Sequence, residues 1–231
     1  NNMLIKKKEG DFMKLTINKN IEIKNETQIK CVVIMWLYYY VSLYLFDIAD
    51  RIYSLWATRW FISALYIIIT IPVVLVYKKW GGHREPKINL KDYRQYIYGI
   101  LTLIPYYIVK VIVLGPDTEL GLTITEISFG ELAWSFLYYA VIVACCEEFV
   151  FRVFFQGELV KILGKLSCLA PFIAAVLFAL AHIPQGYIEQ VYIAFGAGLV
   201  LGYARYFIPG YSFISLVMAH GLYDFLIIML L

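Results

Sequence analysis

Charged residues are scarce in this chain, and their scarcity excludes most classes of soluble protein. Asp, Glu, Lys and Arg make up only 16% of the 231 residues, whereas 61% are hydrophobic and the mean hydropathy is +0.71. Soluble domains carry about 25% charged residues, so this composition is typical of an integral membrane protein. We therefore expect membrane lipid as a partner and no binding of nucleic acid.

Several familiar motifs are also missing. The cysteines form no CxxC pair and lie in or beside apolar stretches, at Cys31, Cys145, Cys146 and Cys168. This placement argues against a disulfide framework. The chain has no HExxH motif of zinc proteases and no GxSxG motif of serine hydrolases. Only one aspartate lies deep in an apolar stretch, so a two-aspartate intramembrane protease is not supported.

Long apolar stretches predict an all-α, polytopic bundle of transmembrane helices. Each crossing needs about 20 apolar residues. The pattern predicts seven crossings, at residues 31–46, 60–77, 95–114, from 132 onward, 168–182, 188–207 and 213–231. An eighth crossing would require one of these boundaries to be misplaced. We divide the chain into a polar cytoplasmic leader (1–30), N-terminal transmembrane helices (31–129) and a core of transmembrane helices that carries the candidate catalytic residues (130–231).

The distribution of lysine and arginine predicts the orientation of the chain in the membrane. Successive polar segments on the side of the N-terminus hold seven, six, three and one of these residues, against two, none and none on the other side. Segments rich in positive charge remain in the cytoplasm. We therefore expect a cytoplasmic N-terminus, an external C-terminus, and a cavity that opens to the cytoplasmic side or laterally to lipid.

Three ionisable residues interrupt the apolar stretch 144–152, which reads Ala-Cys-Cys-Glu-Glu-Phe-Val-Phe-Arg. An ionised side chain at the centre of a spanning helix costs roughly 2.5–3.5 kcal/mol, so such a cluster indicates a functional site by default. On an α-helix Glu148 and Arg152 share one face and can form an ion pair, whereas Glu147 points about 100° away. We interpret the pair as structural support and Glu147 as a carboxylate that faces a cavity. A helix-packing ion pair without catalysis is the alternative.

Two histidine motifs follow in later apolar stretches. His182 ends the sequence Phe-Ala-Leu-Ala-His, and His220 begins His-Gly-Leu-Tyr-Asp, which puts it one helical turn before Asp224. Each histidine alone is more often a packing residue than a catalyst. An unpaired aspartate in lipid would be hard to keep ionised, so Asp224 needs a partner such as His220.

Helical rise brings these motifs to one depth. Glu147 and His182 are equally distant from the turn at Gly164-Lys165, about 26 Å above it at 1.5 Å per residue. By the same rise His220 lies about 15 Å above the turn at Gly210. The two levels agree if residues 156–163 project beyond the bilayer. One cavity can then hold all three groups.

The three motifs in this order, Glu-Glu-x-x-x-Arg, Phe-x-x-x-His and His-x-x-x-Asp, resemble the CPBP family of intramembrane proteases from about residue 130 to 228. That family includes the CAAX prenyl endopeptidases and bacterial relatives linked to bacteriocin self-immunity and peptide maturation. The resemblance implies that Glu147 and His182 activate the attacking water. It implies that His220 and Asp224 stabilise the oxyanion.

The same resemblance assigns Glu148 and Arg152 to bracing the site. Asp224 departs from the prenyl endopeptidases, which place asparagine at this position. An ionised aspartate cannot donate a hydrogen bond. Asp224 must therefore be protonated, orient His220, or bind something else.

Two other functions stay open. Glu147, His182 and His220 together have the composition of a His₂Glu zinc site. Against zinc, only His220 has an evident carboxylate to orient its second ring nitrogen, and the resemblance favours a water activated without metal, so we expect no cofactor. A non-enzymatic immunity or transport protein is the other alternative, although the chain shows no inverted repeat. The expected substrate is a membrane-associated peptide or protein terminus, prenylated or not.

Overall fold

The computed structural model describes residues 2–53, 59–80, 89–115, 128–185 and 187–230, with the side chains of the first helix described from Glu26 onward. All regular structure in these residues is helical, which confirms the all-α class. The helices are α1 (Asn2–Tyr53), α2 (Arg59–Trp80), α3 (Arg94–Leu114), α4 (Phe129–Phe136), α5 (Ala144–Glu148), α6 (Gln156–Leu163), α7 (Ala170–Ala181), α8 (Ile188–Phe207) and α9 (Phe213–Leu230). Two π-helical segments, Leu137–Val143 and Phe149–Phe155, flank α5, and 3₁₀ segments at Gly164–Leu169 and Ile183–Gln185 flank α7.

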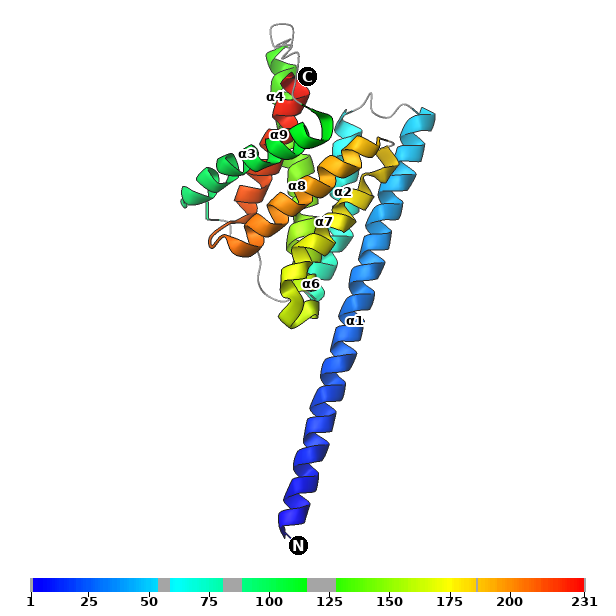
Figure 1. The fold of residues 1–231 in the computed structure, drawn as a ribbon. Helices are drawn as coiled ribbons and strands as arrows, with labels where there is room; N and C mark the ends of the chain where they lie inside the picture. The colour runs from blue at the N-terminus through cyan, green and yellow to red at the C-terminus, as the bar shows by residue number, and fades with distance from the viewer. Residues whose placement is uncertain (1, 54–58, 81–88, 116–127, 186, 231) are drawn as a thin grey trace.

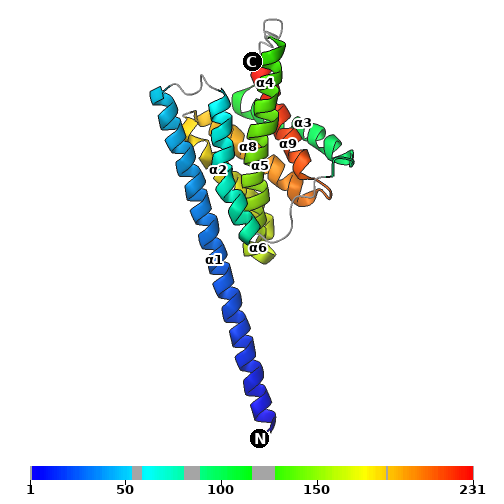
Figure 2. The same cartoon turned by 180° about the vertical axis from the view of Figure 1, so that it is seen from behind.

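The column from α4 to α6 is the centre of the bundle. Figures 1 and 2 show α1 and α2 along one side of this column and α3 and α9 along the other, while α8 crosses the bundle next to α7 and α3. After α6 the chain turns at Gly164, whose φ of 53° is readily adopted by glycine, and α7 returns beside α6 and α8. Segments far apart in the sequence, such as α5 and α9, are therefore neighbours in the bundle.

Glycines allow the helices that carry the polar motifs to pack closely. A Cβ atom on Gly198 of α8 would lie 2.9 Å from the Cα of Ala175 in α7, so only glycine permits this approach. A Cβ atom on Gly221 of α9 would lie only 2.4 Å from the Cα of Ala140. The second contact presses α9 against the central column next to His220.

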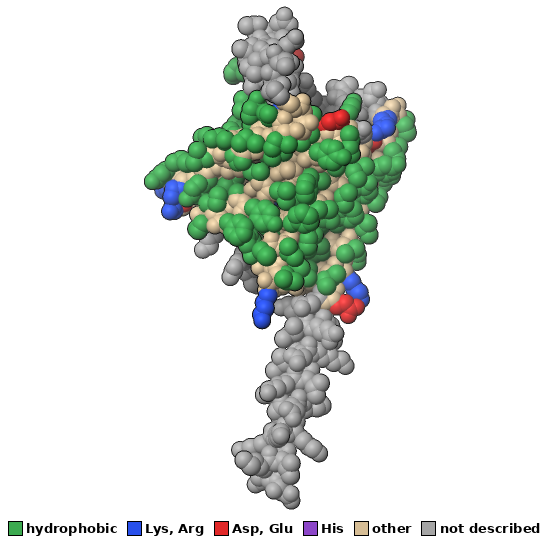
Figure 3. All heavy atoms as spheres, viewed as in Figure 1, with side chains coloured by type: hydrophobic (Ala, Val, Ile, Leu, Met, Phe, Trp, Pro, Cys, Tyr) green, Lys and Arg blue, Asp and Glu red, His purple; other side chains and the backbone are tan. Residues whose placement is uncertain are grey.

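The apolar surface and helix lengths are those of an integral membrane protein. Green apolar side chains cover most of the face in Figure 3, and charged side chains gather toward its ends. Four intervals are long and apolar enough to span a membrane: Glu26–Ala49, Phe61–Lys79, Arg94–Leu114 and Phe129–Ala181. The last is 53 residues long and includes the turn at Gly164, and α9 adds a shorter apolar stretch. Seven crossings therefore stay a prediction.

The predicted boundaries coincide with α8 and lie within two residues of α7. Predicted residues 188–207 coincide with α8, whereas α7 begins at Ala170 rather than at residue 168 because a 3₁₀ turn precedes it. His182 lies just beyond the end of α7 and not within a helix. Pro184 follows two residues later, has no N–H to donate and cannot continue the helix.

Candidate active site

Glu148 and Arg152 form the ion pair that their spacing predicted. Glu148 ends α5 and Arg152 lies in the π-helical segment after it, a kind of distortion that is frequent at functional sites. Glu148 Oε1 is 3.1 Å from Arg152 Nη1, and the two side chains are 0% and 1% exposed. The guanidinium also lies over the Phe178 ring, 4.3 Å from its centroid. Glu148 and Arg152 are thus held on more than one side.

His220 is the second partner of Glu148, a contact that sequence reasoning missed. Nδ1 of His220 lies 2.7 Å from the same Oε1 atom that faces Arg152. Nε2 of His220 lies 3.2 Å from Asp224 Oδ2 and 3.7 Å from Glu147 Oε2. Because carboxylate oxygens accept hydrogen bonds, both ring nitrogens of His220 are placed to donate. This buried histidine of α9 therefore lies next to three carboxylates, of which Asp224 belongs to α9 itself.

Glu147 is the least engaged of these carboxylates. Its side chain is 7% exposed, and the ion-pair partner that the structure gives it is Nε2 of His220 at 3.7 Å, beyond hydrogen-bonding distance. Glu148, by contrast, has partners at 2.7 and 3.1 Å. The structure therefore distinguishes a carboxylate held in place from one available to a further group.

His182 is oriented by the helix that precedes it. Its Nδ1 lies 2.8 Å from the backbone oxygen of Phe178, and a carbonyl only accepts, so Nδ1 carries the hydrogen. In the neutral ring Nε2 then keeps its lone pair. The Phe178 ring contacts both histidines edge-on, with centroids 4.6 Å from His182 and 5.9 Å from His220. Phe178 thus packs between the two imidazoles.

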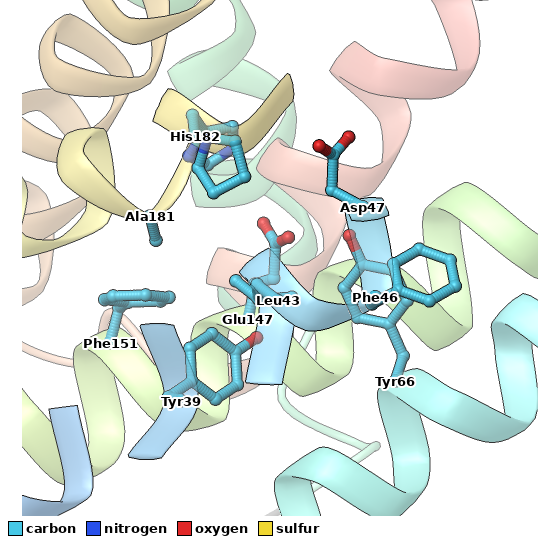
Figure 4. A pocket seen from close by; sticks show the side chains of 10 residues that line it. Tyr39, Leu43, Phe46, Asp47, Tyr66, Glu147, Phe151, Ala181 and His182 are labelled. Atoms are coloured by element: carbon cyan, nitrogen blue, oxygen red, sulfur yellow. The ribbon is translucent and has the colours of Figure 1, made fainter. Parts of the chain in front are cut away.

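Glu147 and His182 line one cavity. Figure 4 shows the Glu147 carboxylate extending toward His182. Much of the remaining wall comes from α1 and α2, which supply Tyr39, Leu43, Phe46, Asp47 and Tyr66. Sequence reasoning missed these wall residues, and the one available signal was the i, i+4 spacing of Asp47 and Arg51, which is typical of an ion pair. His220 lies beside Glu147 rather than in the wall, so the predicted shared cavity is only partly what the structure shows.

Asp47 is a partly exposed residue of the cavity wall, with its side chain 20% exposed. Its Oδ2 is 2.9 Å from Nε of Arg51, and Nη2 of Arg51 donates to the Pro184 carbonyl at 3.1 Å. Arg51 is 65% exposed. Asp47 lies near the end of the span Glu26–Ala49 that is farther from the N-terminus. The orientation of the chain and the side to which the cavity opens, cytoplasmic or lateral, both stay predictions.

The zinc alternative finds no ligand set in this arrangement. Among the residues that the structure describes, no group of three or more His, Cys, Asp and Glu side chains is spaced to hold a metal ion. One argument against zinc was nevertheless wrong, because His182 does have an acceptor for its second nitrogen, the Phe178 carbonyl. Activity without a metal therefore stays a prediction.

Comparison with known families identifies the part of the chain that holds these motifs. Residues 129–226 match the family described as type II CAAX prenyl endopeptidase Rce1-like. No curated protein and no solved structure matches the chain. The matched segment begins with α4, ends within α9 and contains all six polar residues of the three motifs, whereas α1 and α2 lie outside it. The match supports membership of the CPBP family of intramembrane proteases, the family that the three motifs in residues 129–226 resemble.

Proposed function

We propose that the protein is an intramembrane endopeptidase that hydrolyses peptide bonds in membrane-associated peptides or protein termini. One observation carries the proposal. Glu147 is a buried carboxylate in the wall of a cavity that it shares with His182, and it has no hydrogen-bond partner among the described residues. Such a group is suited to accept a proton from a water molecule that both side chains hold.

The reaction follows from these two side chains. A water molecule bonded to Glu147 and to Nε2 of His182 attacks the carbonyl carbon of the substrate, and its proton passes to Glu147. The new C–O bond displaces the carbonyl π electrons onto oxygen. When the tetrahedral intermediate collapses, the C–N bond breaks and Glu147 returns the proton to the departing amine. The products are a carboxylic acid and an amine, so atoms and charge balance.

The remaining polar residues support this step. The contact between Asp224 Oδ2 and His220 Nε2 favours the second of the three roles open to Asp224, that of orienting His220. Nε2 of His220 lies 3.7 Å from Glu147, so His220 stands close to the carboxylate that accepts the proton in this proposal. Glu148 and Arg152 fix His220 from its other side. In this proposal Glu147 and His182 activate the water molecule, and His220, oriented by Asp224, helps to stabilise the negative charge of the tetrahedral intermediate.

The cavity wall favours an apolar substrate segment. Leu43, Phe46 and Phe151 line the same space as Glu147, and aromatic and aliphatic side chains of this kind bind apolar groups. A peptide whose scissile bond lies beside apolar side chains or a lipid group suits such a wall. The substrate class that we propose is therefore a membrane-associated peptide, with prenylation tested directly.

A cleavage assay tests the proposal. Purified protein in liposomes is given two quenched fluorescent peptides of the same sequence, one ending in a farnesylated CAAX motif and one not prenylated. Wild type should cleave at least one of them, and Glu147→Gln should be slower by about 10²–10⁴-fold. Glu158→Gln is the matched control, because Glu158 is equally buried but pairs with Lys161 outside the cavity. Equal rates for Glu147→Gln and wild type would contradict the assignment, and cleavage of neither peptide would favour the immunity or transport alternative.

A further inference from the structure

Tyr39 of α1 carries a buried hydroxyl group. The side chain is 1% exposed, and its Oη atom has no hydrogen-bond partner among the described residues. Buried polar atoms are nearly always paired, so an unpaired one calls for an explanation. Tyr39 also lines the cavity that holds Glu147 and His182. In Figure 4 its hydroxyl end faces the interior of that cavity on the side of Glu147.

Packing explains the ring of Tyr39 but not its hydroxyl. The ring meets Phe151 edge-on, with centroids 5.5 Å apart, and belongs to the largest apolar cluster of the bundle. A phenylalanine would fill the same space and would leave no polar atom without a partner. The hydroxyl therefore lowers the stability of the resting protein.

The cavity is rich in acceptors and poor in donors. The carboxylates of Glu147 and Asp47 accept, and so does Nε2 of neutral His182. The two N–H groups of His220 already face Glu148 and Asp224. Amide hydrolysis requires donors aimed at the oxygen on which negative charge develops. Two wall residues that the structure describes, Tyr39 and Tyr66, carry O–H groups, and Tyr39 is the one whose side chain is fully buried, with its hydroxyl unengaged.

We propose that Tyr39 is a further catalytic residue, whose hydroxyl donates a hydrogen bond to the substrate carbonyl oxygen as that oxygen becomes negatively charged. Tyr39 keeps its proton throughout, so the balance of the hydrolysis is unchanged. The inference rests on the proposed peptidase function. It also gives α1, which lies outside the segment matched to the family, a direct part in the reaction.

Tyr39→Phe separates this role from packing, because it removes only the hydroxyl. Loss of one oxyanion donor lowers kcat by about 10²–10³-fold, and we expect a drop of this size with little change in KM. The midpoint of thermal unfolding should stay equal or rise, since the lost hydroxyl had no partner. A structural role would show the reverse, with lower stability and normal activity per folded molecule.

Tyr211→Phe is the matched control. Its hydroxyl is also buried but donates to Thr102 Oγ1 at 2.9 Å, away from the cavity. This variant should lose thermal stability and keep its kcat. A peptidyl aldehyde of the substrate sequence gives a second readout, because its hydrate resembles the tetrahedral intermediate. Tyr39→Phe should weaken aldehyde binding by a factor similar to its loss in kcat.

The outcomes distinguish this inference from the function on which it rests. If Tyr39→Phe cleaves the liposomal peptide at the wild-type rate while Glu147→Gln is inactive, the Tyr39 role is refuted and the peptidase function stands. If wild type cleaves none of the peptides and binds no aldehyde, both fall together. A slow Tyr39→Phe variant with unchanged thermal midpoint supports the inference.

Discussion

Removing Arg152 should destabilise the protein far more than neutralising Glu147 does. Arg152→Met keeps much of the side-chain length and its contact with Phe178 but leaves Glu148 with His220 as its remaining partner. Glu148 is fully buried, so it cannot compensate by contact with water. Glu147→Gln changes a side chain whose nearest charged partner is 3.7 Å away and removes no direct hydrogen bond.

The magnitudes follow from burial. Breaking a buried ion pair by removing one partner costs about 3–5 kcal/mol, because the other charge stays buried without compensation. For a chain of this size each kcal/mol lowers the midpoint of thermal unfolding by roughly 2–4 °C, so Arg152→Met should lose on the order of 6–20 °C. Glu147→Gln should stay within about 1 kcal/mol of wild type.

Thermal unfolding of the purified proteins in detergent, followed by tryptophan fluorescence, measures both effects. The double variant Glu148→Leu/Arg152→Met tests the role of His220. An apolar pair often replaces a buried ion pair without loss, but here His220 Nδ1 would lose its acceptor, at about 1–3 kcal/mol. We expect partial recovery of the midpoint. A wild-type midpoint for Arg152→Met, or full recovery in the double variant, would refute this reasoning.

Three further predictions concern orientation, metal and packing. In a cysteine-free variant, an impermeant maleimide added outside intact cells should label Gly130→Cys and not Lys91→Cys. The opposite pattern would reverse the predicted orientation. Metal-depleted protein should keep its activity and contain substoichiometric zinc by elemental analysis, whereas loss on depletion with recovery by one equivalent of zinc would make the two motif histidines ligands. Gly221→Ala should lower the free energy of unfolding by about 1–3 kcal/mol, and the activity with it, because its Cβ would lie 2.4 Å from the Cα of Ala140. Gly157→Ala is the control and should change neither, since a Cβ there has no neighbour within 4 Å.

Local rules explain what the sequence predicted correctly. Composition and apolar runs predicted the all-α class and the limits of α8, and i, i+4 spacing predicted the pair of Glu148 and Arg152. These features depend on residues within one helix. The end of α7 before His182 was also within reach, because Pro184 follows two residues later.

Contacts between distant helices explain what the sequence did not predict. No spacing relates Glu148 to His220, which lie 72 residues apart in the chain. The wall that α1 supplies was hidden for a different reason. Lipid-facing and cavity-facing residues of a membrane helix are both apolar, so periodicity does not mark Tyr39 as inward-facing. Only the packed bundle shows that it borders Glu147.

The origin of the oxygen in the product tests the central claim, that Glu147 activates a water molecule. When wild type cleaves its peptide substrate once in H₂¹⁸O, ¹⁸O should appear in the new carboxylate of the product and not in the side chain of Glu147. Glu147→Gln should form no product. Product carrying only ¹⁶O after the first turnover, with ¹⁸O found in Glu147, would show that the carboxylate attacks the substrate itself and would contradict the account.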